Sequence, residues 1–377
     1  MKNRHAVGIE LFSGCGGLST GFLDAGIAVA AGFDVDARAV DAFNYNHAYR
    51  GANGVRIDLS RATGTELLSS AGLSSVDFVI GGPPCQPFSI VGKRLGDEDR
   101  RADLIDHFAR LISELEPRVF LLENVPNLAT IGGGVILDRL VSRLRKNPYA
   151  IRWEIVAAAD FGVPQARRRL VMIGIKGATF VNFPEPTHGP GRLPYRTAKD
   201  AIGDLPDAGE FGETGIFNHE PTHHSPGMIA RLRKLKPGQR ERGSFHDRLD
   251  PDRPSYTLRA GSGNFSPLRP IHYAYDRVIT ARESARIQGF SDHFIWPDRI
   301  PRLQQYRQVG NAVPPQLAAA FAMAIAAQLR WKLRPGALVG NASAREPAMT
   351  MTDEERKAQR TSRTRGASLG GFAISAE

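Results

Sequence analysis

Short apolar runs alternate with amphipathic stretches along the first half of the chain. Runs of this length predict strands, and the stretches between them have room for helices. In the stretch Asp103–Glu116, for example, the apolar residues share one helical face. The alternation predicts an α/β fold with βαβ units in a doubly wound, mostly parallel sheet. The predicted strands are Val7–Phe12, Val29–Asp34, Asp77–Ile80, Val119–Glu123, Arg152–Ala157 and Leu170–Ile175.

The pattern of the chain changes after residue 180. From Pro184 to about Pro270 it is rich in Pro, Gly, His and Arg and has few periodic apolar segments, which predicts short strands and long loops. Helical periodicity returns at Thr280–Ile287 and is strong over Pro315–Leu329. We therefore expect an α/β domain of residues 1–180 plus 304–330 and a smaller irregular, β-rich domain with a hinge over 181–303. A basic tail over 331–377 should be largely disordered from residue 335.

Charge and cysteine content limit the kinds of molecule that the protein is expected to bind. The net charge is +10 and the isoelectric point is about 9.8, which favours a polyanionic partner, because Lys and Arg replace counterions condensed on phosphates. The two cysteines, Cys15 and Cys85, have no CxxC or Cys/His ligand spacing, so we expect neither a disulfide framework nor a bound metal. The longest apolar run, Leu317–Ala327, is shorter than the roughly 20 residues that cross a bilayer. We therefore expect a cytoplasmic protein without membrane contact.

A glycine-rich turn follows the first predicted strand, in the sequence Glu10-Leu-Phe-Ser-Gly-Cys-Gly-Gly-Leu18. Its glycines would let a bulky ligand lie against the backbone, and the following helix N-terminus could face a carboxylate. Asp34 and Asp36 end the next strand, where a carboxylate can bind ribose hydroxyls, and Asp58 follows a third short run. Each feature alone is better explained by a tight turn or a solvated acid. Together they favour a nucleoside cofactor, without choosing between a dinucleotide and S-adenosylmethionine.

Cys85 lies in the sequence Gly81-Gly-Pro-Pro-Cys-Gln-Pro-Phe-Ser89. Prolines on both sides exclude a continuous helix or strand, so the thiol is presented on a stiff loop. Cationic groups or helix-end amides nearby would increase its thiolate fraction. A lone cysteine is usually an inert packed residue, but this Gly- and Pro-rich setting has no evident packing role. We therefore interpret Cys85 as a nucleophile.

Three further motifs complete the set of candidates. Glu123-Asn-Val-Pro126 follows an apolar strand, where the carboxyl could donate a proton, although an N-cap or structural role is the alternative. In Gln165-Ala-Arg-Arg-Arg169 alternation would point Arg167 and Arg169 the same way, towards an anionic or carbonyl-rich ligand. On its own such a run is more often a solvated edge. Gln308-Val-Gly-Asn-Ala-Val-Pro-Pro315 is predicted to open the helix that closes the fold.

In their types and order these motifs resemble those of the bacterial cytosine-5 DNA methyltransferases of restriction–modification systems. The resemblance spans residues 7–330, and it rests on Phe12-Ser-Gly-Cys-Gly-Gly, Gly82-Pro-Pro-Cys-Gln-Pro-Phe-Ser, Glu123-Asn-Val, Gln165-Ala-Arg-Arg-Arg and Gly310-Asn-Ala-Val. It implies the S-adenosylmethionine-dependent methyltransferase fold, S-adenosyl-L-methionine as cofactor and double-stranded DNA as substrate, read by a target-recognition domain over 181–303. The implied reaction methylates carbon 5 of a flipped-out cytosine, through a covalent bond between Cys85 and carbon 6.

The resemblance also implies a role for each matching residue. Cys85 would be the nucleophile and Glu123 the acid that contacts cytosine N3, while Arg167 would bind the base at O2 with Arg169 in support. Phe12 would lie against adenine, Asp34 would bind ribose and Asp58 the adenine amino group. The full set of implied cofactor contacts is Phe12, Gly14, Gly16, Gly17, Asp34, Asp58, Leu59, Pro84, Leu104 and Asn311.

Two basic segments are candidates for DNA contacts. The segment after the nucleophile, Gln86–Arg101, resembles the mobile loop that closes over DNA in this family. Residues 231–242 form the densest basic segment in the middle of the chain, which is either a solvated helix face ending at Pro237-Gly238 or a phosphate-binding surface. The residues expected to contact DNA are Ser89, Lys93, Arg101, Arg233 and Lys236.

Three other functions are disfavoured. An RNA-directed relative acting on tRNA would carry the tripeptide Cys-Phe-Thr, which is absent, and an inactive DNA-binding module would not need intact Cys85, Glu123 and Arg167. A Rossmann oxidoreductase is excluded because Gly14-Cys-Gly-Gly17 does not match GxGxxG. The sequence leaves open the DNA target and whether a cognate restriction endonuclease accompanies the protein, which we expect to be a monomer.

Overall fold

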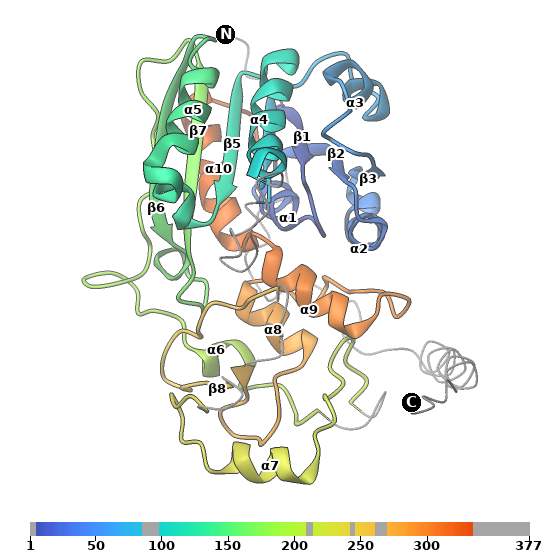
Figure 1. The fold of residues 1–377 in the computed structure, drawn as a ribbon, viewed down its shortest axis with the longest axis vertical. Coiled ribbons are helices and arrows are strands. Elements are labelled where there is room, and N and C mark those ends of the chain that lie inside the picture. The colour runs from blue at the N-terminus through green and yellow to red at the C-terminus, as the bar shows by residue number, and fades with distance from the viewer. Residues whose placement is uncertain (1–4, 85–97, 209–213, 242–245, 261–269, 335–377) are drawn as a thin grey trace.

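A seven-stranded sheet forms the upper lobe of the molecule in Figure 1, with the strand order β3-β2-β1-β4-β5-β7-β6. The computed structural model describes residues 5–84, 98–208, 214–241, 246–260 and 270–334. Strands pair in parallel except that β7 runs antiparallel to both β5 and β6. The strands are β1 (Val7–Leu11), β2 (Ala28–Asp34), β3 (Asn53–Arg56), β4 (Phe78–Gly81), β5 (Val119–Asn124), β6 (Tyr149–Ala157) and β7 (Arg168–Lys176).

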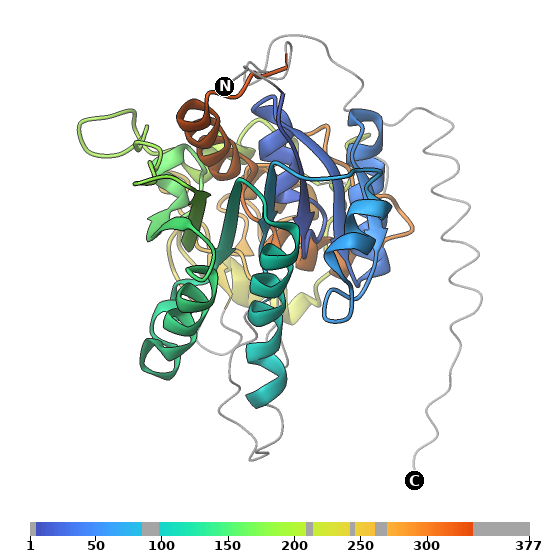
Figure 2. The ribbon, with the colours of Figure 1, turned by 90° about the horizontal axis from the view of Figure 1, so that it is seen from above.

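Helices cover both faces of the sheet (Figure 2). One apolar core lies between the sheet and helices α1 and α10, and the other lies between the sheet and helices α3, α4 and α5. The central strands β4 and β5 are buried along their whole length, as expected for parallel strands enclosed on both sides. The helices of this lobe are α1 (Gly17–Asp24), α2 (Ala37–His47), α3 (Gly64–Ser70), α4 (Glu98–Leu115), α5 (Val135–Leu144) and α10 (Pro315–Leu329).

The strands predicted from apolar runs are all present. Their ends differ by at most three residues, the largest difference being the start of β6 at Tyr149 instead of Arg152. The predicted helix Asp103–Glu116 is α4, which begins earlier, at Glu98. Strand β3 was not predicted, because this four-residue edge strand has Val55 as its one apolar side chain. The predicted α/β fold with a mostly parallel sheet is thus confirmed.

The lower lobe in Figure 1 contains helices α6 (Ala198–Ile202), α7 (Pro226–Arg233), α8 (Ala281–Gln288) and α9 (Arg302–Asn311). Its described part before residue 280 is mostly loop, with the two-residue strands β8 (Asp247–Arg248) and β9 (Pro270–Ile271). Helix α8 begins with a buried capping box of Thr280 and Glu283. Both terminal nitrogens of Arg277 donate to the Glu283 carboxylate at 2.9 Å. This buried, charge-assisted pair anchors the start of α8.

The sequence predicted that the segment Gln308–Pro315 opens the last helix, and this prediction is wrong. It contains the end of α9, then a non-helical link, and only its last residue belongs to α10. Pro314 and Pro315 explain the break, because proline lacks the amide hydrogen and disfavours helical backbone in the residue before it. The link brings α10 back onto the sheet, beside α1.

The helical stretch Arg302–Leu329 has the length and composition to cross a membrane. Helix α10 is nevertheless a core helix, because Leu317, Phe321 and Ile325 are each 1% exposed. Beyond it Trp331 is buried with its ring centroid 5.7 Å from that of Phe78. The packed chain therefore continues past residue 331, where we had expected the tail to begin, and residues 335–377 lie outside the described part.

Glycines let α1 and α10 approach closely. A Cβ atom on Gly21 would lie 2.4 Å from the Pro315 carbonyl oxygen. Gly21→Ala should therefore lower the free energy of unfolding by about 1–3 kcal/mol through overpacking, although alanine is the better helix former. The matched control is Gly227→Ala in α7, where a Cβ would meet nothing within 4 Å, so stability should be unchanged or slightly higher. Urea denaturation measures both, and a stabilised Gly21→Ala would contradict the close packing of α1 against α10.

Candidate active site

The carboxyl ends of strands β1 to β5 lie at the edge of the sheet that faces the lower lobe (Figure 1). Because β7 is antiparallel to β5, its amino-terminal end lies at the same edge. Several of the predicted site residues lie at this edge. The glycine-rich turn follows β1, Asp34 ends β2, Pro84 follows β4, and Arg167 precedes β7.

Glu123 and Arg169 form an ion pair at this edge. The antiparallel register places Val171 opposite Glu123, so Arg169, two residues earlier, is a diagonal neighbour on the same face. Arg169 Nε lies 2.8 Å from Glu123 Oε1, and both side chains are largely buried. This oxygen receives no well-directed hydrogen bond from the described residues. The carboxylate is thus held by charge while keeping hydrogen-bonding capacity for a ligand.

Arg167 is 1% exposed and lies beside this pair. Its Nη1 donates to the Leu258 carbonyl at 3.3 Å and its Nη2 to the Ala312 carbonyl at 3.2 Å. Burial, and next the positive charge of Arg169, lower the pKa of Arg167 to about 9. It remains charged at neutral pH, and its buried Nε has no hydrogen-bond partner within the described chain. The group therefore fits a carbonyl-bearing ligand better than a solvated edge.

The loop that leads to Cys85 is fixed from β5. Asn124 Nδ2 donates to the Pro83 carbonyl at 2.9 Å, and the Asn124 Oδ1 accepts from the Val125 amide. Cys85 itself lies outside the described residues. The other cysteine, Cys15, is 2% exposed, and burial raises the pKa of its thiol far above the ordinary value. Cys15 is therefore unsuited to act as a thiolate nucleophile.

The glycines after β1 differ in purpose, which corrects our interpretation that all three make room for a ligand. A Cβ on Gly16 would lie 2.5 Å from the His47 ring, and one on Gly17 would lie 2.3 Å from the Val313 carbonyl oxygen. These two glycines are required by packing within the protein. At Gly14, where φ is +54°, a Cβ would meet nothing within 4 Å, so this position alone opens to the space in front of the turn.

The residues around Gly14 fit a nucleoside cofactor. Asp34 accepts hydrogen bonds from the Gly14 amide at 2.8 Å and from the Asp36 amide at 2.9 Å, which fixes both carboxylate oxygens. Ser13 Oγ is buried and without a hydrogen-bond partner in the described chain, as expected if it bonds to a ligand. Val35, which the sequence did not single out, is 61% exposed directly after Asp34. An exposed apolar residue beside such an acid suits the face of a base.

Comparison with known proteins identifies the family. Residues 7–327 match the family model described as C-5 cytosine-specific DNA methylase. The Type II methyltransferase M1.HphI of Haemophilus parahaemolyticus is 34% identical over 332 residues, covering 84% of this chain and 86% of that protein. M.XorII of Xanthomonas oryzae pv. oryzae is 34% identical over 374 residues, covering 86% of each. The chain belongs to the C-5 cytosine-specific DNA methylases.

Solved structures share the fold of this methylase. A protein assigned as a DNA modification methyltransferase, encoded within an E. coli prophage, has a TM-score of 0.73 and 30% identity. That match covers 86% of this chain and 99% of the other. Dnmt2 of S. pombe has a TM-score of 0.64 over 87% of this chain, but at 17% identity it supports the fold alone. The enzyme is a DNA cytosine-5 methyltransferase, and the predicted methyltransferase fold is confirmed.

The remaining predicted cofactor contacts are more scattered in the methylase. Asp58 is exposed and accepts from the Ser60 amide and hydroxyl, while Leu59 is buried and its carbonyl accepts from Arg110. Leu104 of α4 is half-buried, and Pro84 is exposed. Asn311 is exposed at the end of α9, and Phe12 adopts the left-handed region with φ 55°. A non-glycine residue with positive φ at such a turn is typical of a functional site.

The residues predicted to contact DNA differ in their surroundings. Arg233 Nε donates to Asp276 at 3.0 Å, and the same carboxylate binds the buried Arg248, so Arg233 already has a structural partner. Helix α7 ends at Arg233, before the expected Pro237-Gly238, and Lys236 is exposed. Ser89, Lys93 and the side chain of Arg101 lie outside the described part of the chain.

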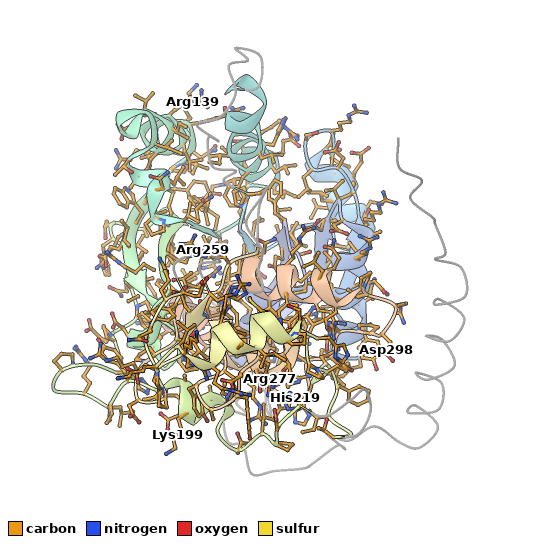
Figure 3. All side chains as sticks on the ribbon, turned by 60° about the horizontal axis from the view of Figure 1, so that its bottom comes forward. Arg139, Lys199, His219, Arg259, Arg277 and Asp298 are labelled. Carbon is orange, nitrogen blue, oxygen red and sulfur yellow. The ribbon has the colours of Figure 1, made fainter. Side chains whose placement is uncertain are left out.

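Arg259 is a basic residue near the site, and it was not predicted from the sequence. It follows Leu258, whose carbonyl binds Arg167, and its own backbone packs against Gly310. Its side chain is exposed, and Figure 3 shows it well away from His219 and Arg277 of the lower lobe. No local sequence signal marks it, because its closeness to the site depends on contacts between distant segments.

Glu10 should make the stability of the methylase depend on pH. Burial raises the pKa of Glu10 to about 8, although Ser19 donates to it from both amide and hydroxyl. The native state therefore keeps a proton that the unfolded chain loses above pH ~4.5, so this contribution to stability is lost as pH rises towards 8. As the pH rises from ~4.5 to 8, the free energy of unfolding of the wild type should fall, relative to that of Glu10→Gln, by up to about 1.4 kcal/mol per pH unit. Urea denaturation at pH 5 and pH 8 measures this, and parallel pH dependences would contradict it.

Proposed function

We propose that this methyltransferase moves a methyl group from S-adenosyl-L-methionine to carbon 5 of a cytosine that it flips out of a specific duplex DNA sequence. The observation that carries the proposal is the cluster of Glu123, Arg167 and Arg169 beside the loop that Asn124 pins. A base in a duplex hides carbon 6 in the stack, so a pocket of this kind requires an extrahelical base.

The chain supplies a nucleophile and a group that stabilises charge at N3. The thiolate of Cys85 attacks carbon 6, and the electron pair of the 5,6 double bond moves towards N3, where Glu123 provides the proton or hydrogen bond. Carbon 5 thereby becomes nucleophilic enough to take the methyl group from the sulfonium, which the cofactor supplies when bound. A base such as a water molecule then takes the proton from carbon 5, the bond between carbon 6 and sulfur breaks to release the Cys85 thiolate, and N3 returns its proton to Glu123, which restores the aromatic ring.

Arg167 and Arg169 hold the base during this sequence. Arg167 presents its Nε, which has no hydrogen-bond partner among the described residues, towards the cytosine O2, where negative charge develops as Cys85 adds. Arg169 keeps Glu123 in place through their ion pair and supports the positive potential of the pocket. Because these groups are fixed before the base arrives, little reorganisation is needed when it enters.

The cofactor would lie in front of the turn at Gly14. Asp34 would bind the ribose hydroxyls through the unused lone pairs of its carboxylate, and Phe12 and Val35 would pack against the adenine. Asp58 and the Leu59 backbone would reach the adenine edge. Gly16 and Gly17 would shape the turn. Pro84, Leu104 and Asn311 would contact the outer parts of the cofactor.

DNA would be read by residues 181–303 and held by the surrounding basic groups. We place phosphate contacts at Lys236 and Arg259, with Arg233 in a weaker role because Asp276 already pairs with it. Ser89, Lys93 and Arg101 remain candidates from the segment after the nucleophile. We assign residues 1–180 plus 304–330 to the catalytic domain, and we place the start of the tail after residue 334.

The cellular setting follows from this activity. An enzyme that modifies DNA in a bacterial restriction–modification system would act as a monomer in the cytoplasm. A cognate restriction endonuclease, if the cell has one, would act separately on the same DNA sequence. The net charge of +10 would assist capture of any duplex before the target is found.

Trapping the DNA tests the proposed function. Duplex DNA with 5-fluorocytosine at the target should form a denaturation-resistant complex with the wild type when S-adenosylmethionine is present, because fluorine cannot leave as the proton does. Cys85→Ala should form none, while Cys15→Ala should still form it, since Cys15 is buried and its thiol is protonated. Denaturing gel electrophoresis detects the complex. A Cys85→Ala protein that still traps the DNA would exclude Cys85 as the nucleophile.

Cofactor binding should depend on Asp34. Asp34→Asn removes the charge from a hydrogen bond to ribose, worth on the order of 1.5–3 kcal/mol, so affinity for S-adenosylhomocysteine should fall about 10- to 150-fold. The matched control is Asp36→Asn, because Asp36 is exposed and caps α2, a position where Asn serves equally well. Calorimetry measures both. Weaker binding in the Asp36 variant alone would move the ribose contact to Asp36.

A further inference from the structure

Two fully buried glutamines connect the sheet to the lower lobe. Gln165 lies just before Arg167 and Gln288 is the last residue of α8, and both are 0% exposed. Gln165 Nε2 donates to Gln288 Oε1 at 2.6 Å, and Gln288 Nε2 donates to the Ala312 carbonyl at 2.5 Å. Gln165 Oε1 accepts from the Leu258 amide at 3.0 Å. We call Gln165 and Gln288 the glutamine pair.

The glutamine pair ends on the two residues that hold Arg167. The guanidinium donates to the carbonyls of Leu258 and Ala312, and the pair binds Leu258 through its amide and Ala312 through its carbonyl. Each acceptor of Arg167 is therefore fixed by one of the two glutamines. A shift of either backbone segment would rotate the guanidinium relative to Glu123 and Arg169.

The same link reaches the cofactor turn. Ala312 belongs to the chain between α9 and α10, whose Val313 carbonyl is in close contact with Gly17. Cys15 Sγ lies 3.8 Å from the Gln308 carbonyl in the last turn of α9. One short segment thus touches the cofactor turn, Arg167 and the glutamine pair, which in turn is attached to α8 of the lower lobe.

Neutral amides suit this position better than the alternatives. An apolar pair would leave the Leu258 amide unsatisfied, and a charged group would compete for Arg167. Buried amides with matched partners impose a single arrangement of the segments they join. The pair therefore does more than fill space at the junction of the lobes.

Resting on the proposed role of Arg167, we propose that the glutamine pair is a positioning device. It holds the Leu258 and Ala312 carbonyls so that Arg167 is aimed at the target base, and it makes this aim depend on how α8 and the lower lobe are placed. Gln165 and Gln288 act through Arg167 and need not touch the substrate.

Gln288→Leu tests the proposal through a kinetic difference. Misplacing Arg167 by about 1 Å should lower kcat on the order of 10- to 100-fold, while the KM for S-adenosylmethionine changes little. The matched control is Gln305→Leu, since Gln305 is also buried and donates to a backbone carbonyl, but to that of Ile300 and not to either carbonyl that accepts from Arg167. It should lose comparable stability and keep its kcat. An equal loss of kcat in both variants would overturn the proposal.

A double-mutant cycle separates this proposal from the role of Arg167 itself. Arg167→Lys alone should lower kcat, and adding Gln288→Leu should then have little further effect, because the group being aimed is already gone. If the two reductions multiply, the glutamine pair does not act through Arg167. If Arg167→Lys leaves kcat unchanged, the proposed role of Arg167 fails, and the present proposal with it.

Gln288→Glu provides an isosteric second variant in case Gln288→Leu does not fold. Its carboxylate still accepts from Gln165 but cannot donate to Ala312 until it is protonated. Its kcat relative to the wild type should therefore rise as the pH is lowered. A ratio that does not change with pH would overturn the proposal.

Discussion

The antiparallel direction of β7 is the constraint on which the rest of the site depends. Parallel strands bring their carboxyl ends to one edge, so groups that follow β1, β2, β4 and β5 meet there. The arginines of the Gln165–Arg169 segment come before their strand, and they reach this edge only because β7 runs against β5. A parallel β7 would place Arg167 and Arg169 at the opposite edge, and the buried charge of Glu123 would lose its partner.

Several features of the site could be predicted from local sequence because local chemistry decides them. A Gly-rich turn after an apolar strand and acids at strand ends need no distant partner to be recognised. The edge strand β3 escaped prediction because pairing with β2, and not apolar burial, makes it a strand. The purpose of Gly16 and Gly17 also escaped it, since His47 and Val313 approach them from distant parts of the chain.

The roles of the glutamine pair and of Arg259 could not be predicted from the sequence either, because they also depend on contacts between distant parts of the chain. Gln165 and Gln288 are 123 residues apart, and neither has a neighbour in sequence that signals their contact. The lower lobe combines a buried apolar cluster around Phe294 and Trp296 with buried ionic pairs such as that of Arg277 with Glu283. Ion pairs between distant segments leave no mark in the local sequence. Arg233, which pairs with Asp276, was therefore predicted to contact DNA because it lies in the densest basic segment.

Helix α10 closes a domain whose first strand is about 300 residues earlier in the chain. Until a ribosome releases the segment from Ala312 onwards, α1 lacks its packing partner and Arg167 lacks one of its two carbonyl acceptors. The proposed site is thus completed only after the segment that contains Ala312 has been synthesised. A polypeptide interrupted before Ala312 would carry Cys85, Glu123 and Arg167 but would lack α10 and one carbonyl acceptor of Arg167, so we expect such a fragment to be unable to modify the genome.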